Sequence, residues 1–300
     1  MVRGAIPAAL TPLRGDGEAL DEEAFAPYVE FLAGAGLDAI FALGTTGEGI
    51  LLRGEERRRA GELFAAACAR RVPLVLHCGA QSTSETVALC EHAASLGVAG
   101  IAVVAPPYYA FDERALLHHF SAAARACAPT PFYLYEFEAR SGYAIPLSVV
   151  ERLVEEAPNL RGAKVSDAPW DKVAPYLVGE LDVFVGAEAL IPTALAAGAA
   201  GAVSGLASAF PEPVVALVRD PGEETLATVR GLREALPRFP FVAAAKRVLA
   251  RRGLPVREAC RAPMRALTAD ERALVDRVVA GWADGVSSED RASPPVAPRA

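Results

Sequence analysis

Short apolar runs alternate with longer amphipathic runs over most of the chain. The apolar runs are AIPAAL, AIFALG, VPLVLHCG, GIAVVAP, TPFYLYE, LRGAKV, DVFVGA and GAVSGL. Apolar residues fill both alternating sets of positions in each run, as expected for strands that are covered on both faces. Residues 21–36, 82–97 and 111–128, which lie between such runs, have helical spacing. Eight strand–helix pairs in roughly 210 residues predict an α/β fold, a (β/α)8 TIM barrel, rather than a doubly wound sheet.

The chain beyond the eighth run shows helical patterns only. EETLATVRGLREAL, PFVAAAKRVLARRG and TADERALVDRVVAGWAD predict three helices that pack beside the barrel. The last stretch, GVSSEDRASPPVAPRA, is rich in Pro and Ser, a composition typical of disorder. We expect a catalytic barrel over residues 1–220, a three-helix C-terminal extension over residues 221–284 and a disordered tail over residues 285–300.

Charge and cysteine content narrow the class of protein. The chain has 52% hydrophobic and 22% charged residues and a formal net charge of −7. This charge argues against a general nucleic-acid or anionic-membrane surface, because both partners are polyanions. The five cysteines are scattered and form no CxxC pair, which favours reduced thiols. With no apolar run near the ~20 residues of a membrane helix and no signal-peptide pattern at the start, we expect a cytoplasmic protein that binds neither nucleic acid nor membranes.

A lysine interrupts the sixth apolar run. Only three of the 30 basic residues are lysines, so ordinary surface charge in this chain is carried by arginine. Lysine is depleted from strands and is rarely buried without a partner. Lys164 is therefore a candidate nucleophile, because an amine desolvated among apolar groups is favoured in its neutral form and can make a Schiff base with a ketone. The alternative is a structural ion pair with an acid in the barrel, such as Glu188.

Two further segments put polar groups at the ends of predicted strands, where TIM barrels keep their catalytic residues. Tyr135 shares a strand face with Tyr133 and Phe137, and a phenol near an imine can transfer protons during C–C bond cleavage. GTTGEG, residues 44–49, offers two hydroxyls and closely spaced N–H groups to a small carboxylate. Taken separately, Tyr135 is also compatible with a core or interface tyrosine, and GTTGEG with an ordinary turn.

Together these motifs resemble the dihydrodipicolinate synthase / N-acetylneuraminate lyase family of pyruvate-dependent class I aldolases. The matching stretches are GTTGEG, PPYY, YLYEFEARSG and RGAKVSD, supported by VFVGAEALIPTALAAGAAGAVSGLAS and AAKRVLARRGLPVREACRAPMRALT. Their order and spacing follow the family over residues 4–280. The resemblance implies a TIM barrel, a lyase reaction that needs no metal or organic cofactor, and a homodimer or homotetramer.

The resemblance also implies roles for single residues. Lys164 would form the imine with pyruvate, and Tyr135 would be the general acid and base above it. Thr45 and Thr46 would bind the pyruvate carboxylate. Thr45 would also link Tyr135 to Tyr109, which in the family reaches into a neighbouring subunit's site.

The half of the site that takes the second substrate departs from the family pattern. Arg140 matches the arginine that holds the acidic group of that substrate in the synthases, whereas Gly186 and Val203 would line the pyruvate pocket through main-chain contacts. The family's Tyr-Asn-x-Pro-x-Arg-Thr-Gly reads YEFEARSG here, so Glu136 and Glu138 flank the arginine. Either glutamate could pair with Arg140 or repel a second carboxylate, because charges within about 4–6 Å interact strongly. The alternative is that both point into solvent and change nothing.

The sequence therefore predicts a Schiff-base-forming, pyruvate-dependent lyase similar to dihydrodipicolinate synthase. Its substrates would be pyruvate and an aldehyde, or the corresponding 2-keto acid. A 2-keto-3-deoxy-sugar acid aldolase or an N-acetylneuraminate lyase-type enzyme is the alternative, because the altered motif weakens the case for aspartate semialdehyde. A keto-acid-binding protein without catalysis is a further alternative. A metal-dependent enzyme is disfavoured, because His77 and Cys78 lack a nearby second set of ligands.

Overall fold

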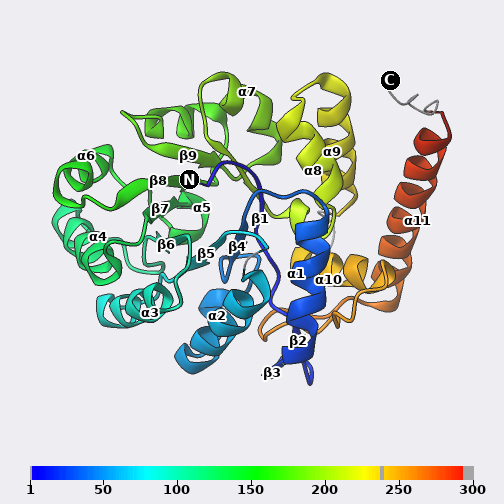
Figure 1. Cartoon of the computed structure of the whole chain (residues 1–300), viewed down its shortest axis with the longest axis horizontal. Helices are drawn as coiled ribbons and strands as arrows, with labels where there is room; N and C mark the ends of the chain where they lie inside the picture. The colour runs from blue at the N-terminus through cyan, green and yellow to red at the C-terminus, as the bar shows by residue number, and fades with distance from the viewer. Residues whose placement is uncertain (1, 70, 237–239, 293–300) are drawn as a thin grey trace, which may run out of the picture.

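Eight parallel strands form the centre of the molecule. The computed structural model describes residues 2–69, 71–236 and 240–292 (Figure 1). The strands are β1 (Gly4–Pro7), β4 (Ile40–Ala42), β5 (Leu74–His77), β6 (Gly100–Val104), β7 (Phe132–Glu136), β8 (Leu160–Val165), β9 (Asp182–Val185) and β10 (Gly201–Ser204). They run in the order β1-β10-β9-β8-β7-β6-β5-β4, and a parallel bridge between Ala8 and Phe41 closes the sheet. The predicted TIM barrel and its eight strands are confirmed.

Helices surround this barrel (Figure 1). They are α1 (Phe25–Gly34), α2 (Gly54–Cys68), α3 (Thr83–Ser95), α4 (Glu113–Cys127), α6 (Leu147–Glu156), α7 (Ile191–Ala196) and α8 (Pro211–Arg219), and the four-residue α5 (Glu138–Ser141) follows β7. Ser82 accepts a hydrogen bond from the Glu85 N–H, and Asp112 from the Ala115 N–H, so side chains cap α3 and α4. An apolar layer between the strands and these helices forms the main core.

A second, smaller apolar cluster fills the inside of the barrel. Tyr133, Tyr135 and Phe137 on and after β7 belong to it, whereas Phe132 and Leu134 face the helices, as the strand alternation predicts. In the parallel register Tyr135 pairs with Lys164 on β8. The register thus places the two candidate catalytic side chains next to each other.

Three helices follow the barrel in the segment where three were expected. They are α9 (Glu223–Ala235), α10 (Phe241–Arg251) and α11 (Ala269–Ala292). Residues 285–292 are helical, in contrast to the disorder expected there. Polar residues such as Ser and Asp are only mildly unfavourable in a helix that apolar contacts have already nucleated. Residues 293–300, the rest of that expected tail, lie outside the described residues.

A short antiparallel hairpin was not predicted. It consists of β2 (Leu13–Arg14) and β3 (Ala19–Leu20). Gly17 in its turn has φ +92°, and a Cβ there would lie 1.9 Å from the carbonyl oxygen of Cys260. Strands of two residues are too short to show an alternation pattern. In the described part of the chain, no helix is long and apolar enough to cross a membrane.

Candidate active site

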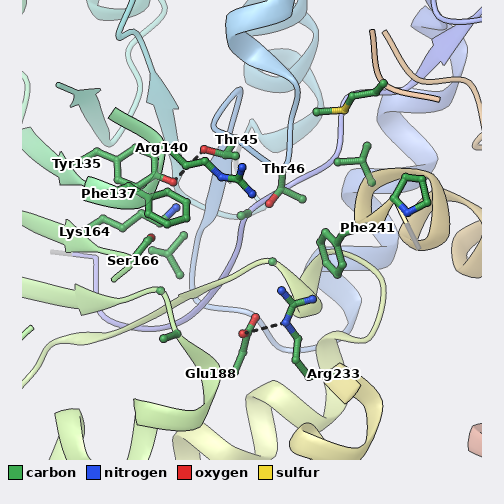
Figure 2. A pocket seen from close by; sticks show the side chains of 18 of the residues that line it. Thr45, Thr46, Tyr135, Phe137, Arg140, Lys164, Ser166, Glu188, Arg233 and Phe241 are labelled. Atoms are coloured by element: carbon green, nitrogen blue, oxygen red, sulfur yellow. Dashed lines mark hydrogen bonds and ion pairs between the residues drawn. The ribbon is translucent and has the colours of Figure 1, made fainter. Parts of the chain in front are cut away.

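A cavity of about 630 Å³ opens at the C-terminal ends of the barrel strands (Figure 2). Seven of the residues expected in the site line it: Thr45, Thr46, Tyr135, Arg140, Lys164, Gly186 and Val203. They come from the loop after β4, from the ends of β7 and β8, from α5, and from the segments around the ends of β9 and β10. In a TIM barrel this is the end at which active sites lie.

Lys164 lies at the base of this cavity. Lys164 is only 5% exposed. Its Nζ atom lies 3.9 Å from the ring centroid of Tyr135 and 4.6 Å from that of Phe41. A small apolar space beneath it is bordered by Val75 and Phe184, among others. Within the described part of the chain, Lys164 makes no ion pair. The amine is thus enclosed by aromatic and aliphatic groups and is accessible only from the cavity.

Glu188, the acid considered as a structural partner for this lysine, is bonded elsewhere. Its Oε1 atom accepts from Ser204 Oγ at 2.8 Å and from the Leu206 N–H at 3.1 Å. Its Oε2 atom lies 3.8 Å from Nε of Arg233. The structure therefore contradicts the ion-pair interpretation of Lys164.

Tyr135 is fixed above the lysine by its neighbours. It is 1% exposed, and the ring of Phe41 and that of His77 meet it edge-on, with centroids at 5.9 Å and 5.7 Å. Its hydroxyl forms a 3.1 Å hydrogen bond with Oγ1 of Thr45. Thr45 is exposed at the pocket. The two hydroxyls therefore connect the buried end of the cavity with its opening.

His77 supports Tyr135 as a neutral ring. Its Nδ1 atom lies 3.0 Å from the Leu43 carbonyl oxygen, and Arg57 donates to the carbonyl groups of His77 and Gly79. Burial, together with the nearby Arg57 charge, lowers the pKa of His77 well below its usual range. Among the described residues, no group of three or more His, Cys, Asp and Glu side chains could hold a metal ion.

Neither glutamate of the altered motif pairs with Arg140. Glu138 forms an ion pair with Lys172 at 2.6 Å. Glu136 is 1% exposed and accepts from the Ile145 N–H at 2.8 Å, so the expectation that it points into solvent is also wrong. The reason is that β7 turns Glu136 toward the surrounding helices, opposite to the barrel interior. Among the residues that the structure describes, Arg140 has no ion pair, and its guanidinium lies 5.7 Å from the ring centroid of Phe137.

The C-terminal extension contributes pocket residues that the sequence did not indicate. Arg233 on α9 and Phe241 on α10 line the cavity, and the guanidinium lies 4.7 Å from the centroid of the ring. Ser166, just beyond β8, lines it as well. The periodicity of the last third of the chain locates helices, but it does not show which of their side chains turn toward the barrel.

Tyr109 is the one predicted site residue that does not line the pocket. It is 65% exposed and lies in an aromatic patch with Tyr108 and Phe111, at ring-centroid distances of 4.8 Å and 6.5 Å. The patch follows β6, and none of its three residues lines the cavity. A role in a neighbouring subunit's site stays a prediction.

Comparison with known proteins shows what the whole chain is similar to. The model of the dihydrodipicolinate synthetase family matches residues 1–281. An uncharacterized DapA-like lyase from Halobacterium salinarum is 35% identical over 284 residues, which cover 92% of each chain. The crystal structure of dihydrodipicolinate synthase from Aquifex aeolicus matches with a TM-score of 0.87 and 26% identity, covering 94% of this chain and 98% of that one. N-acetylneuraminate lyase from Proteus mirabilis matches with a TM-score of 0.83 and 27% identity, covering 92% and 98%.

Proposed function

Because this chain belongs to the dihydrodipicolinate synthetase family of lyases, we propose that it catalyses a pyruvate-dependent aldol reaction through an imine on Lys164. The observation that carries the proposal is a buried amine without an ion-pair partner among the described residues, beside the hydrogen-bonded hydroxyls of Tyr135 and Thr45. Amines in such surroundings are nucleophiles toward carbonyl carbon. The reaction needs no metal or organic cofactor.

The proposed steps use these groups as follows. The Lys164 amine adds to the C2 carbonyl of pyruvate, and loss of water forms the imine. Loss of a proton from C3 gives an enamine, whose C3 atom attacks the aldehyde carbon and forms the new C–C bond. Addition of water to the product imine then releases the 2-keto acid and restores the amine. Tyr135 carries the protons of these steps, and Thr45 connects its hydroxyl to the pocket opening.

We place the pyruvate carboxylate between the loop after β4 and the end of β9. Thr45 and Thr46 supply hydroxyls there, and Gly186 and Val203 form the opposite wall. A Cβ at Gly186 would lie 2.2 Å from Oγ of Ser166, so a larger residue would clash with Ser166 and displace this wall. We therefore assign pyruvate to this part of the cavity.

The second substrate is an aldehyde with an acidic group, as in dihydrodipicolinate synthase. Arg140 supports this assignment, because neither neighbouring glutamate neutralises it. Figure 2 shows Arg140 and Arg233 directed toward the middle of the pocket. A guanidinium binds a carboxylate through two parallel hydrogen bonds.

An aldolase for a 2-keto-3-deoxy-sugar acid, or an N-acetylneuraminate lyase-type enzyme, is the second candidate. Ser166 and Glu188 put a hydroxyl and a carboxylate on the same cavity, and such groups bind the hydroxyls of a sugar chain. The likeness to N-acetylneuraminate lyase agrees with this candidate. A keto-acid-binding protein without turnover is the third.

An activity panel separates these functions. We expect condensation of pyruvate with aspartate semialdehyde to exceed cleavage of 2-keto-3-deoxygluconate or N-acetylneuraminate. Lys164→Ala should abolish every such activity, whereas Lys172→Ala, a change at an exposed lysine in the segment that follows β8, should not. Full turnover by Lys164→Ala contradicts the proposal. Pyruvate binding without turnover on any of these compounds supports the binding protein instead.

Assembly and location complete the proposal. The exposed aromatic patch of Tyr108, Tyr109 and Phe111 supports a homodimer or homotetramer, because such patches are commonly covered by a partner. Light scattering on the purified chain tests this directly, and a monomer at micromolar concentration contradicts it. A cytoplasmic location stays the expectation drawn from the cysteines and the charge.

A further inference from the structure

Two buried carboxyl groups hold the segment that carries Arg140. We call residues 137–145 the arginine loop. Asp167, beyond β8, accepts hydrogen bonds at 2.8 Å and 3.3 Å from the first two N–H groups of α5, at the start of this loop. Glu136 accepts at 2.8 Å from the N–H of Ile145, at its end. Asp167 thus holds the start of the arginine loop, and Glu136 holds its end.

The two anchors lie next to each other without a basic partner. Glu136 is 1% and Asp167 6% exposed. Glu136 pairs with Val165 in the register of β7 and β8, and Asp167 follows Val165 by two residues, so the two carboxyl groups lie on the same side of neighbouring strand ends. Lys172 is engaged by Glu138 at 2.6 Å. Among the described residues, neither anchor forms an ion pair. Two adjacent carboxylates in such surroundings cannot both be ionised at low cost, so one proton is retained.

The surroundings of Glu136 favour its protonated form. Burial raises the pKa of Glu136 to about 8, and the charge of Asp167 and its hydrogen bond act in the same direction. The Ile145 N–H opposes the shift. A carboxylic acid on Glu136 can accept from this N–H with one oxygen and donate its O–H to Asp167 with the other.

We propose that Glu136 and Asp167 form an acid–carboxylate pair that shares one proton and positions Arg140 for the acidic group of the second substrate. The pair explains how Glu136 can take the place of the asparagine in the family motif. The protonated Glu136 is a neutral donor and acceptor, as the asparagine of the usual motif is. Loss of the proton would set two negative charges side by side and remove the O–H that joins the two carboxyl groups, so their repulsion would weaken the hold of the pair on the arginine loop. Only the kinetic consequence rests on the proposed function.

The other ionisable groups around the pair keep their charge between pH 7 and pH 9. Burial raises the pKa of Tyr143 to about 12 and raises that of Tyr176 further, with the nearby Glu136 adding to both shifts. The hydroxyls of both tyrosines donate to backbone carbonyl groups. The ion pair with Glu138 raises the pKa of Lys172, so this lysine stays charged. A change in the loop over this range therefore reports on Glu136.

Hydrogen–deuterium exchange of the full chain tests the anchoring without any substrate. We expect the protection of peptides within the arginine loop, corrected for intrinsic exchange, to fall about tenfold from pH 7 to pH 9, as Glu136 loses its proton. Glu136→Gln keeps a neutral donor and acceptor, so its protection should not depend on pH. Glu155→Gln, an exposed glutamate on α6, is the matched control and should behave as the wild type.

A second variant keeps the test decisive if Glu136→Gln does not fold. Asp167→Asn removes the neighbouring charge, so the fall in protection should move to lower pH. The proposal is overturned if the protection of the arginine loop depends on pH equally in the wild type and in Glu136→Gln. It is also overturned if the fall in protection occurs at the same pH in Asp167→Asn as in the wild type.

Kinetics test the link to Arg140. The KM for aspartate semialdehyde should rise with pH in the wild type and stay constant in Glu136→Gln, while the KM for pyruvate is the same in both. A parallel change of both KM values overturns positioning through Arg140. If this aldehyde is not turned over, the proposed function fails at that point, whereas the exchange experiment still decides whether the pair exists.

Discussion

A buried ion pair joins the GTTGEG loop to the C-terminal extension. Nζ of Lys246 on α10 lies 2.6 Å from Oε1 of Glu48, and both side chains are 0% exposed. The ammonium also donates to the Ala259 carbonyl oxygen at 2.6 Å, and the second carboxylate oxygen accepts from the Arg261 N–H at 2.6 Å. Glu48 itself has φ +57°, a left-handed conformation that this network stabilises.

Breaking this pair should be costly. Lys246→Met removes the ammonium and leaves the carboxylate buried, which costs about 3–5 kcal/mol of unfolding free energy. For a chain of 300 residues, at an unfolding entropy of about 2.1 cal/mol/K per residue, that corresponds to a decrease in Tm of roughly 5–8 °C. Replacing both residues, as in Glu48→Leu with Lys246→Met, should recover a large part of the loss, because no unpaired charge remains.

Urea and thermal unfolding measure these changes. Arg59→Ala is the matched control, because Arg59 is half exposed, pairs with Glu22 and Glu62, and should cost at most about 1 kcal/mol. Lys246→Met should also raise the KM for pyruvate, since Glu48 belongs to the loop of Thr45 and Thr46. A Lys246→Met protein within about 1 kcal/mol of the wild type would refute this reasoning.

Three more predictions concern single residues. Tyr135→Phe should lower kcat by a factor of about 10²–10⁴. Its effect should be non-additive with that of Thr45→Val, because the two hydroxyls are hydrogen-bonded. Additive losses contradict proton transfer through the two hydroxyls together. Arg140→Ala should raise the KM for an acidic aldehyde about 10- to 100-fold and leave that for pyruvate unchanged, with the exposed Arg125→Ala as control; equal rises for both substrates argue against the assignment. Burial lowers the pKa of His119 to about 4. As the pH falls from 6.5 toward 4, this histidine is protonated in the unfolded chain but not yet in the folded one. The free energy of unfolding should therefore decrease over this range, by up to about 3 kcal/mol. Urea unfolding of His119→Gln at pH 4.5 and pH 7 should show a smaller difference than in the wild type, and an unchanged difference contradicts this cause.

The sequence was most informative where local patterns determine structure. Apolar runs on both alternations identified the eight strands, because a strand covered on both faces must be apolar throughout. Lys164 stood out since its surroundings in the sequence are apolar and the chain otherwise uses arginine. The register of β7 and β8 then placed it beside Tyr135.

These local patterns did not predict contacts between segments that are distant in the sequence. The partner of Glu138 is Lys172, which follows a different strand. The burial of Glu136 depends on the space behind β7 and on Asp167, which its own motif does not reveal. Arg233 reaches the pocket from α9, and its position depends on how that helix packs on the barrel. Charge pairing and helix packing are properties of the folded chain.

Trapping with borohydride and pyruvate, read by intact-mass and peptide mass spectrometry, tests the proposed chemistry most directly. One reduced pyruvyl group should appear on the peptide that contains Lys164, and none on those of Lys172 or Lys246. Lys164→Ala should show no adduct. A folded wild-type protein without an adduct, or with the adduct on another lysine, would contradict an imine at Lys164.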